Sequence, residues 1–156
     1  MDIFDEEIVN LWKLLHKYHV RYIMVGGFAT NLHGFSRITA DADIWLEDNL
    51  ENRKGFRSAI KELGIGDFQQ FETIEFVAGY SSIMLDSGIE LDVMTQLKDF
   101  GKEQFSDCLY LAAKAKIHEI EVPFLHLNHL LREKKATGRP KDLLDIEELK
   151  KANNIE

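Results

Sequence analysis

The sequence predicts an α+β fold in which a small mixed sheet is flanked by helices, and three observations indicate it. A helical apolar repeat near the N-terminus precedes a short, wholly apolar run that ends in Gly26-Gly27, as a buried strand does. Two later apolar runs flank Asp86-Ser87-Gly88, which is typical of a hairpin. Pro140 then opens a C-terminal helix, because proline favours the first helical position.

The individual elements follow from apolar spacing and from the residues that end each run. Helices are expected at about 6–19, 28–33 (closed by Gly34), 56–63 (closed by Gly64), 128–136 (with Asn128 as N-cap) and 140–152. Strands are expected at 22–25, 42–46, 83–85, 89–94 and 117–125, the last with Pro123 at a sheet edge. Residues 65–80 fit either irregular or strand structure.

Composition narrows the class of protein. The chain has 156 residues, of which 45% are hydrophobic, and this suits one domain spanning 1–156. The net charge of −8 disfavours tight, nonspecific binding to nucleic acid. Cys108 is the single cysteine and fits a reducing compartment. No apolar run approaches the roughly 18 residues of a membrane span, and the acidic start is unlike a signal peptide, so we expect a cytoplasmic protein without membrane contact.

Two aspartates at alternate positions stand at the start of the second strand. Residues i and i+2 of a strand face the same way, so Asp41 and Asp43 project together. The same arithmetic pairs Glu90 with Asp92 on a later strand. If the two strands are neighbours, three or four carboxylates meet on one face. Such crowding favours a divalent cation, although solvated surface acids remain the alternative.

The Gly26-Gly27 pair lies between a buried strand and a helix. Without side chains, this backbone can approach an anion closely and aim its N–H groups at it. A tight turn that needs only positive φ is the alternative. The motifs of phosphate loops and of dinucleotide-binding loops are absent.

Together these residues resemble the DNA polymerase β-like nucleotidyltransferase superfamily. Its pattern is a Gly-Gly or Gly-Ser turn, a short helix, an Asp-x-Asp pair on the next strand and a third Asp on a later strand. Gly26, Gly27, Asp41, Asp43 and Asp92 occupy those positions. The resemblance implies the nucleotidyltransferase fold, with a catalytic core at about 20–100 and a C-terminal strand and helices at about 115–152.

The resemblance also implies roles. Asp41 and Asp43 would hold two Mg²⁺ ions, with Mn²⁺ as the alternative, on a nucleoside triphosphate such as ATP. Gly26 and Gly27 would cradle its phosphates. Asp92 would help to hold the metal that activates the acceptor and would take the acceptor proton. The implied reaction is transfer of a nucleoside monophosphate group to an acceptor hydroxyl.

Two strings narrow the resemblance to a bacterial branch. Both are similar to sequences of AbiEii-type toxins and their uncharacterised relatives. The first string is GGFATNLHG followed by R-x-T-x-D-x-D, and the second is the ending KKATGRPKDLLDIEEL at 134–149. The first string also looks like lincosamide and aminoglycoside nucleotidyltransferases. A toxin–antitoxin setting with a cognate partner protein is therefore implied. The acceptor stays open among a tRNA end, a protein hydroxyl and a small molecule.

Four basic residues are further candidates for nucleotide binding. Arg37 lies between the glycines and the aspartates and would either reach a phosphate or pair with the carboxylates. Lys134, Arg139 and Lys141 form a basic cluster, and by resemblance one or more would contact the phosphates. Their alternative role is pairing with acids of the last helix.

Other interpretations belong to other classes of protein. A degenerate member of the superfamily would bind a nucleotide or a partner protein without chemistry, and a structural domain would carry the acids only as solvated groups. A zinc hydrolase would rest on the histidine pairs at 16/19 and 126/129, which lack a third ligand at recognisable spacing.

Overall fold

The computed structural model describes residues 5–36 and 41–156. Its helices are α1 (Glu6–Lys17), α2 (Gly26–Leu32), α3 (Leu50–Glu62), α4 (Phe105–Leu111), α5 (Leu127–Thr137) and α6 (Pro140–Ala152). Two 3-10 turns, η1 (Gln69–Glu72) and η2 (Lys102–Gln104), lie in connections. The strands are β1 (Tyr22–Val25), β2 (Asp41–Leu46), β3 (Ser82–Met84), β4 (Glu90–Met94), β5 (Ala113–Ile117) and β6 (Ile120–Phe124).

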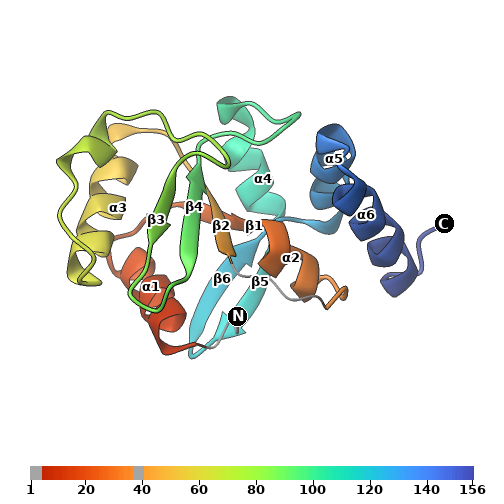
Figure 1. Ribbon diagram of the computed structural model, residues 1–156, viewed down its shortest axis with the longest axis horizontal. Helices are drawn as coiled ribbons and strands as arrows, with labels where there is room; N and C mark the ends of the chain where they lie inside the picture. Colours follow the sequence, from red (N-terminus) through yellow and green to blue (C-terminus); the bar gives the residue numbers. More distant parts are fainter. Residues whose placement is uncertain (1–4, 37–40) are drawn as a thin grey trace.

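The six strands form one mixed sheet in the order β3-β4-β2-β1-β6-β5. The pairs β2–β4 and β1–β6 are parallel, and the other three pairs are antiparallel. Helices α1 and α3 pack together at one end of the molecule, and α5 and α6 pack together at the other (Figure 1). The α+β expectation, with a small mixed sheet flanked by helices, is therefore confirmed.

Helix α1 and the central strand β1 anchor the hydrophobic core. One face of α1 buries Ile8, Leu11, Trp12 and Leu15, the residues with helical spacing, and the Trp12 ring stacks on Tyr22 of β1 at a centroid distance of 5.7 Å. All four residues of β1 are buried, as expected for a strand with neighbours on both sides. This core fixes the carboxyl end of β1, where the glycine pair lies.

The sequence prediction is wrong for the C-terminal strand and for the place of its proline. The segment expected as one strand at 117–125 is a hairpin of β5 and β6, turned through His118 and Glu119, which both have positive φ. Pro123 consequently lies on β6, which has β5 and β1 on its two sides, and the sheet edge is β5. The proline is tolerated because β6 meets β1 only near its end, where Met24 lies opposite Phe124.

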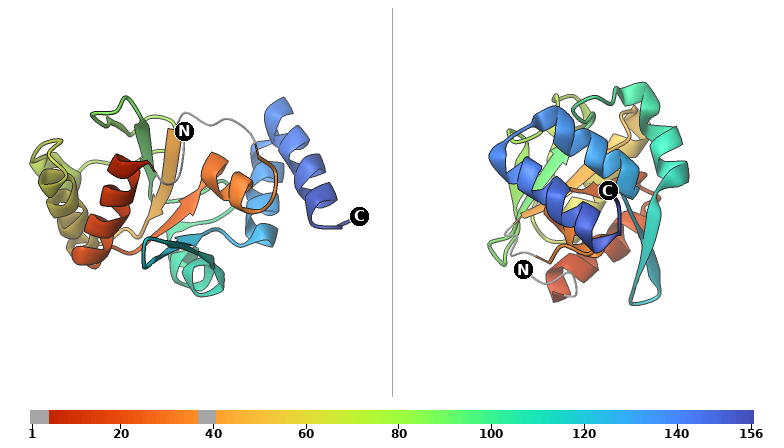
Figure 2. Two further views of the ribbon diagram at one scale, coloured as in Figure 1. Left: turned by 90° about the horizontal axis from the view of Figure 1, so that it is seen from below. Right: turned by 90° about the vertical axis from the view of Figure 1, so that its right-hand side faces the viewer.

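Helices α5 and α6 form a unit beside the sheet rather than a cover over one face. Figure 2 shows the pair from two further directions, with the carboxyl end of α5 close to the start of α6. Gly138 links them with a φ of +62°, the left-handed conformation that commonly ends a helix. The turn between them brings 133–142 towards the ends of β1 and β4. Within the described residues, no helix has the length and apolar character needed to cross a bilayer.

Candidate active site

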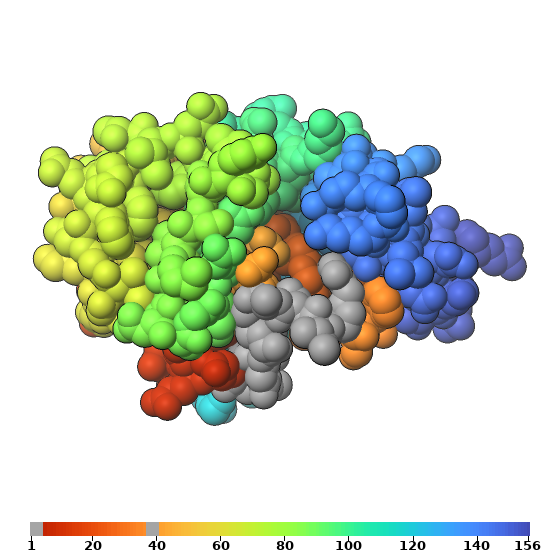
Figure 3. Space-filling model, viewed as in Figure 1, coloured from red at the N-terminus to blue at the C-terminus, as the bar shows by residue number. Residues whose placement is uncertain are grey.

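The three aspartates singled out in the sequence lie together on neighbouring strands. Strands β2 and β4 run parallel in a register that places Asp41 opposite Glu90 and Asp43 opposite Asp92. Asp41, Asp43 and Asp92 all line one cavity of about 650 Å³, whereas Glu90 is not among its lining residues. In Figure 3 the surface is hollowed between the green segment that includes β4 and the blue α5 and α6, with the orange residues recessed between them.

The glycine pair lies against Asp43. Val25 is opposite Asp43 in the β1–β2 ladder, so Gly26 follows directly beside the carboxylate. Gly26 has a φ of +65°, and a Cβ at this position would overlap the Asp43 carboxylate. The N–H of Gly27 donates a hydrogen bond to that carboxylate. Positive φ and close approach to the aspartate both require glycine here.

The helix after the glycines begins earlier than expected. The sequence suggested a helix from residue 28, preceded by a separate Gly-Gly turn, but α2 starts at Gly26 itself. The two glycines are therefore its first residues, and Val25 is the extended N-cap without a side-chain hydrogen bond. Thr30 Oγ1 donates to the Gly26 carbonyl at 3.0 Å, which holds this first turn.

Burial and mutual repulsion raise the pKa values of Asp43 and Asp92. Burial, followed by the charges of Asp92 and Asp41, raises the pKa of Asp43 from 3.8 to about 7. Burial is also the main cause that raises the pKa of Asp92, although the Gly79 N–H donates to its carboxylate at 2.8 Å and opposes the shift. Holding Asp43 and Asp92 in their ionised form costs electrostatic free energy, and a bound cation would lower that cost.

The donor set of this cavity fits magnesium. Mg²⁺ takes oxygen ligands and is usually held by one or two carboxylates together with substrate phosphates and water. Across the described residues, no three His, Cys, Asp or Glu side chains already stand around one metal position. Asp41, Asp43 and Asp92 would therefore supply a partial coordination shell that the phosphates of a nucleotide complete.

The basic cluster borders the same cavity, but two of its members are engaged. Lys134, Arg139 and Lys141 all line it. The Lys134 ammonium lies 2.7 Å from Asp145, and both side chains are almost fully buried, so this pair ties α5 to α6. Lys134 therefore has the alternative role, an ion pair with an acid of the last helix.

Arg139 is similarly paired with Asp142. Its Nε lies 2.6 Å from the Asp142 carboxylate, which also accepts from the Thr137 hydroxyl at 2.8 Å. Burial alone would raise the pKa of Asp142, but the hydrogen bonds from Arg139 and Thr137 outweigh it and lower the pKa. Lys141 is exposed, and Arg37 lies outside the described residues. Nucleotide contact by these four residues stays a prediction.

Two lining residues were missed by sequence reasoning. Glu133 of α5 carries a further carboxylate to the cavity, and its charge contributes to the raised pKa of Asp43. Burial raises the pKa of Glu133 itself. Lys98, which follows β4, also lines the cavity. In the sequence, Glu133 is marked as a site candidate only by its place directly before Lys134. Lys98 is marked only by its place after Asp92, the third aspartate.

The histidine pairs have other roles. His126 caps α5, since its Nδ1 accepts a hydrogen bond from the Asn128 N–H at 3.0 Å. The N-cap is thus His126 rather than Asn128. His16 Nε2 lies 3.1 Å from the Tyr22 hydroxyl, and neither residue lines the cavity. The zinc interpretation finds no support among the described side chains.

Comparisons with known proteins identify the fold. No family model and no curated protein matches the chain. The lincomycin-bound lincosamide antibiotic adenylyltransferase LnuA is 17% identical, with a TM-score of 0.60 over 94% of this chain and 96% of that one. A putative nucleotidyltransferase from Thermotoga maritima is 18% identical, with a TM-score of 0.54 over 92% and 88%.

A third solved structure agrees. An antigenic nucleotidyltransferase-like protein from Paracoccidioides brasiliensis is 19% identical, with a TM-score of 0.54 over 90% of this chain and 72% of that one. The three structures share the arrangement of a mixed sheet with flanking helices over most of the chain. At this level of identity they show the architecture alone. The chain has the nucleotidyltransferase fold.

Proposed function

We propose that the chain is a magnesium-dependent nucleotidyltransferase, which moves a nucleoside monophosphate group from a nucleoside triphosphate to an acceptor hydroxyl. The observation that carries the proposal is the register of β2 with β4. It places Asp43 beside Asp92, with Asp41 and Gly26 in the same cavity, in a chain with the nucleotidyltransferase fold. Solvated surface acids would not be expected to gather at a half-buried site.

The chain's own residues divide the work. Asp41 and Asp43 would hold the metal that binds the triphosphate, and Asp92 would face the acceptor. When bound, magnesium neutralises phosphate charge and stabilises the attacking and leaving oxygens. The Asp92 carboxylate, held by the Gly79 N–H, receives the acceptor proton, and its raised pKa suits that role. One bond forms between the acceptor oxygen and the α-phosphorus, and the bond to the leaving pyrophosphate breaks.

The glycine pair acquires its phosphate role only when Asp43 turns to the metal. The Gly27 N–H now donates to the Asp43 carboxylate. With Asp43 turned towards a bound cation, this N–H would be free to donate to a phosphate oxygen, and the exposed Lys141 also lines the cavity. Binding of metal and nucleotide are therefore coupled in this proposal.

The donor and the biological setting rest on weaker support. LnuA, an adenylyltransferase, favours ATP as the donor. The ending at 134–149, similar to that of AbiEii-type toxins, favours a toxin–antitoxin setting with a cognate protein, and no structural comparison bears on it. Both stay predictions, as does the cytoplasmic location.

A label-transfer experiment tests the reaction without knowing the acceptor. The protein is incubated with Mg²⁺ and each α-labelled triphosphate, together with separated RNA, protein and small-molecule fractions of a bacterial lysate. We expect label in one fraction, reduced by orders of magnitude in Asp43→Asn and retained in Glu103→Gln, which changes an exposed acid outside the cavity. Equal labelling by the Asp43→Asn variant, or no label in any fraction, would overturn the proposal.

A further inference from the structure

Strand β5 forms an open edge of the sheet. It is the last strand in the order β3-β4-β2-β1-β6-β5, so β6 is its only neighbour among the described strands. The right-hand view of Figure 2 shows the β5–β6 hairpin projecting from the body of the molecule. An open strand edge presents backbone N–H and C=O groups to which another extended chain can add.

The register of the hairpin decides which residues of β5 present those groups. The turn has two residues, both with positive φ, so the pair that flanks it, Ile117 with Ile120, is a hydrogen-bonded pair. Hydrogen-bonded and non-hydrogen-bonded pairs alternate along an antiparallel ladder, which places Lys114 and Lys116 in non-hydrogen-bonded pairs. Their N–H and C=O groups therefore point away from β6, towards the open edge.

The same two residues carry positive charge. Lys114 and Lys116 are exposed and, because they are two positions apart, lie on one face of β5. Their neighbours across the hairpin are Pro123 and Glu121. Among the described residues, no ion pair joins either ammonium group to a carboxylate. The edge thus combines outward backbone groups with uncompensated positive charge at the same two positions.

These charges act against a second copy of the chain as the occupant of the edge. Antiparallel pairing of two β5 strands about Ala115 would place Lys114 of each copy directly opposite Lys116 of the other. Like charges directly opposite one another destabilise a pair of strands. Lysines at the edge therefore protect this sheet from pairing with itself. An acidic strand would meet attraction in place of that repulsion.

Large exposed side chains lie at the start of the same edge. Tyr110 and Leu111 end α4 just before β5, and their exposed fractions are 87% and 51%. Protection against self-pairing does not require such residues. A segment paired antiparallel to β5 would end beside them, where an apolar side chain of that segment would remove apolar surface from water.

We propose that β5 binds an acidic, extended segment of a partner protein, which adds to the sheet as a further strand. Glutamate or aspartate residues at alternate positions lie opposite Lys114 and Lys116. A small or apolar residue lies between them, beside Ala115, and another apolar residue follows towards Leu111. Backbone hydrogen bonds supply the affinity, and the charges select the class of partner.

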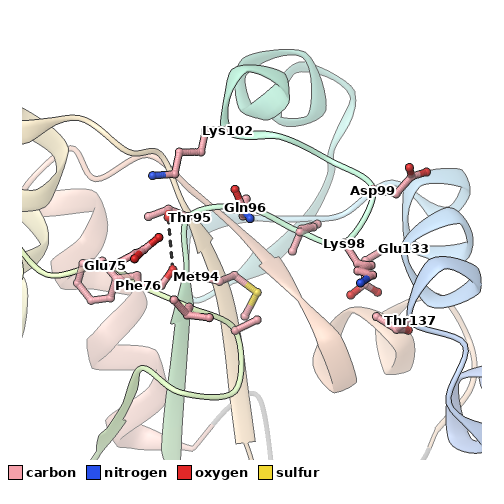
Figure 4. A pocket seen from close by; sticks show the side chains of 13 residues that line it. Glu75, Phe76, Met94, Thr95, Gln96, Lys98, Asp99, Lys102, Glu133 and Thr137 are labelled. Atoms are coloured by element: carbon pink, nitrogen blue, oxygen red, sulfur yellow. Dashed lines mark hydrogen bonds between the residues drawn. The ribbon is translucent and has the colours of Figure 1, made fainter.

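This edge is separate from the proposed active site. A second cavity of about 500 Å³ shares Met94, Lys98 and Glu133 with the cavity of the aspartates, and Figure 4 shows Glu133 and Thr137 at its α5 side. The two cavities therefore belong to one cleft, and no residue of β5 lines either of them. The inference consequently goes beyond the proposed function and does not depend on it.

Short peptides of defined charge test the inference on the whole chain. The probe is the terminally blocked peptide Val-Glu-Val-Glu-Val-Leu, whose binding is measured by calorimetry at low salt. We expect a Kd of roughly 10 to 100 µM. Replacing both glutamates by lysine should weaken binding by at least about tenfold. N-methylation of the two glutamate amides keeps the charges but removes the N–H donors, and should weaken binding by a similar factor, about tenfold.

Charge reversal on β5 supplies a matched variant. Lys114→Glu/Lys116→Glu should bind the lysine peptide and lose the glutamate peptide, while it keeps the wild-type affinity for the magnesium nucleotide. Lys54→Glu/Lys135→Glu makes the same change of charge at exposed lysines outside β5 and should keep the preference of the wild type. Amide hydrogen exchange of the wild type at residues 114 and 116 should slow when the glutamate peptide is bound.

Several results would overturn the proposal. They are equal binding of the glutamate and lysine peptides, equal binding of the N-methylated peptide, no binding at about 1 mM, and retention of the glutamate peptide by the charge-reversed variant. Slow exchange of the β5 amides without peptide, together with a dimer in sedimentation, would also do so, because a second copy would then occupy the edge. The peptide series uses the wild type, so it decides the matter even if the reversed variant does not fold.

Discussion

Replacing Asp43 by asparagine should stabilise the metal-free protein while destroying its chemistry. Burial and the neighbouring acids raise the pKa of Asp43 to about 7, so the folded state holds its proton more tightly than the unfolded state does. The stability that comes from the protonated form is present below the unfolded pKa and is lost as pH rises towards 7. Asparagine has the same shape, carries no charge and still accepts from the Gly27 N–H.

The structure sets the size of the effect. A shift from 3.8 to about 7 corresponds to about 4 kcal/mol at 1.36 kcal/mol per pKa unit. Because water reaches part of the cleft, we expect Asp43→Asn to raise the free energy of unfolding by about 2 to 4 kcal/mol above pH 7. For a chain of this length that is a rise in Tm of roughly 5 to 15 °C.

Urea denaturation in EDTA, from near pH 4 to about pH 8, measures this directly. The difference between variant and wild type should be close to zero at the acidic end and reach its plateau above about pH 7. Added Mg²⁺ should stabilise the wild type and leave Asp43→Asn unchanged, so that the gap narrows. Glu103→Gln, which removes an exposed acid, controls for net charge. An Asp43→Asn variant equal to or less stable than the wild type at neutral pH would refute the electrostatic reasoning.

Three further predictions follow from the site. Gly26→Ala should lower Tm and abolish nucleotide binding, because the added Cβ meets the Asp43 carboxylate. Gly64 also has positive φ but faces open space, so the control variant Gly64→Ala should cost only about 1 kcal/mol of stability. Equal losses in the two variants would contradict this. Lys134→Ala should destabilise the fold by about 3 to 5 kcal/mol in urea denaturation, since it removes the ammonium that lies 2.7 Å from the buried Asp145 carboxylate, and the double variant Lys134→Met/Asp145→Leu should recover most of the loss; no recovery would point to a role beyond pairing. Lys141→Ala should weaken binding of the magnesium nucleotide about tenfold in calorimetry without changing Tm, and unchanged affinity would remove Lys141 from the phosphate site.

The sequence predicted the sheet best where periodicity and turn chemistry agree. Tyr22–Val25 is a strand with the predicted ends, and the hairpin about Asp86-Ser87-Gly88 is present as β3 and β4. The C-terminal hairpin was missed because its turn uses His118 and Glu119 in positive φ, a conformation that such residues seldom signal. The early start of α2 was missed because glycine normally marks a turn rather than a helical residue.

The candidate site was predicted from the alternation of side chains along strands. Alternation alone put Asp41 with Asp43 and placed Asp92 on the same face once β2 and β4 are neighbours. Glu133 and Lys98 could not be found this way, because their approach to the cavity depends on how the α5–α6 pair and the segment after β4 fold back. The same tertiary contacts commit Lys134 to Asp145, which a local pattern of basic residues does not reveal.

The most direct test of the central claim is a thermal-shift panel with ATP, GTP, CTP and UTP, each with and without Mg²⁺, on the wild type and on Asp43→Asn. A nucleotide at about 100 times its Kd adds roughly 2.7 kcal/mol to folding stability. We expect a rise in Tm of the wild type that requires both Mg²⁺ and a nucleotide, and no such rise in the variant. A rise that is the same without Mg²⁺, the same in the variant, or absent with all four nucleotides would contradict a metal–nucleotide site built on these aspartates.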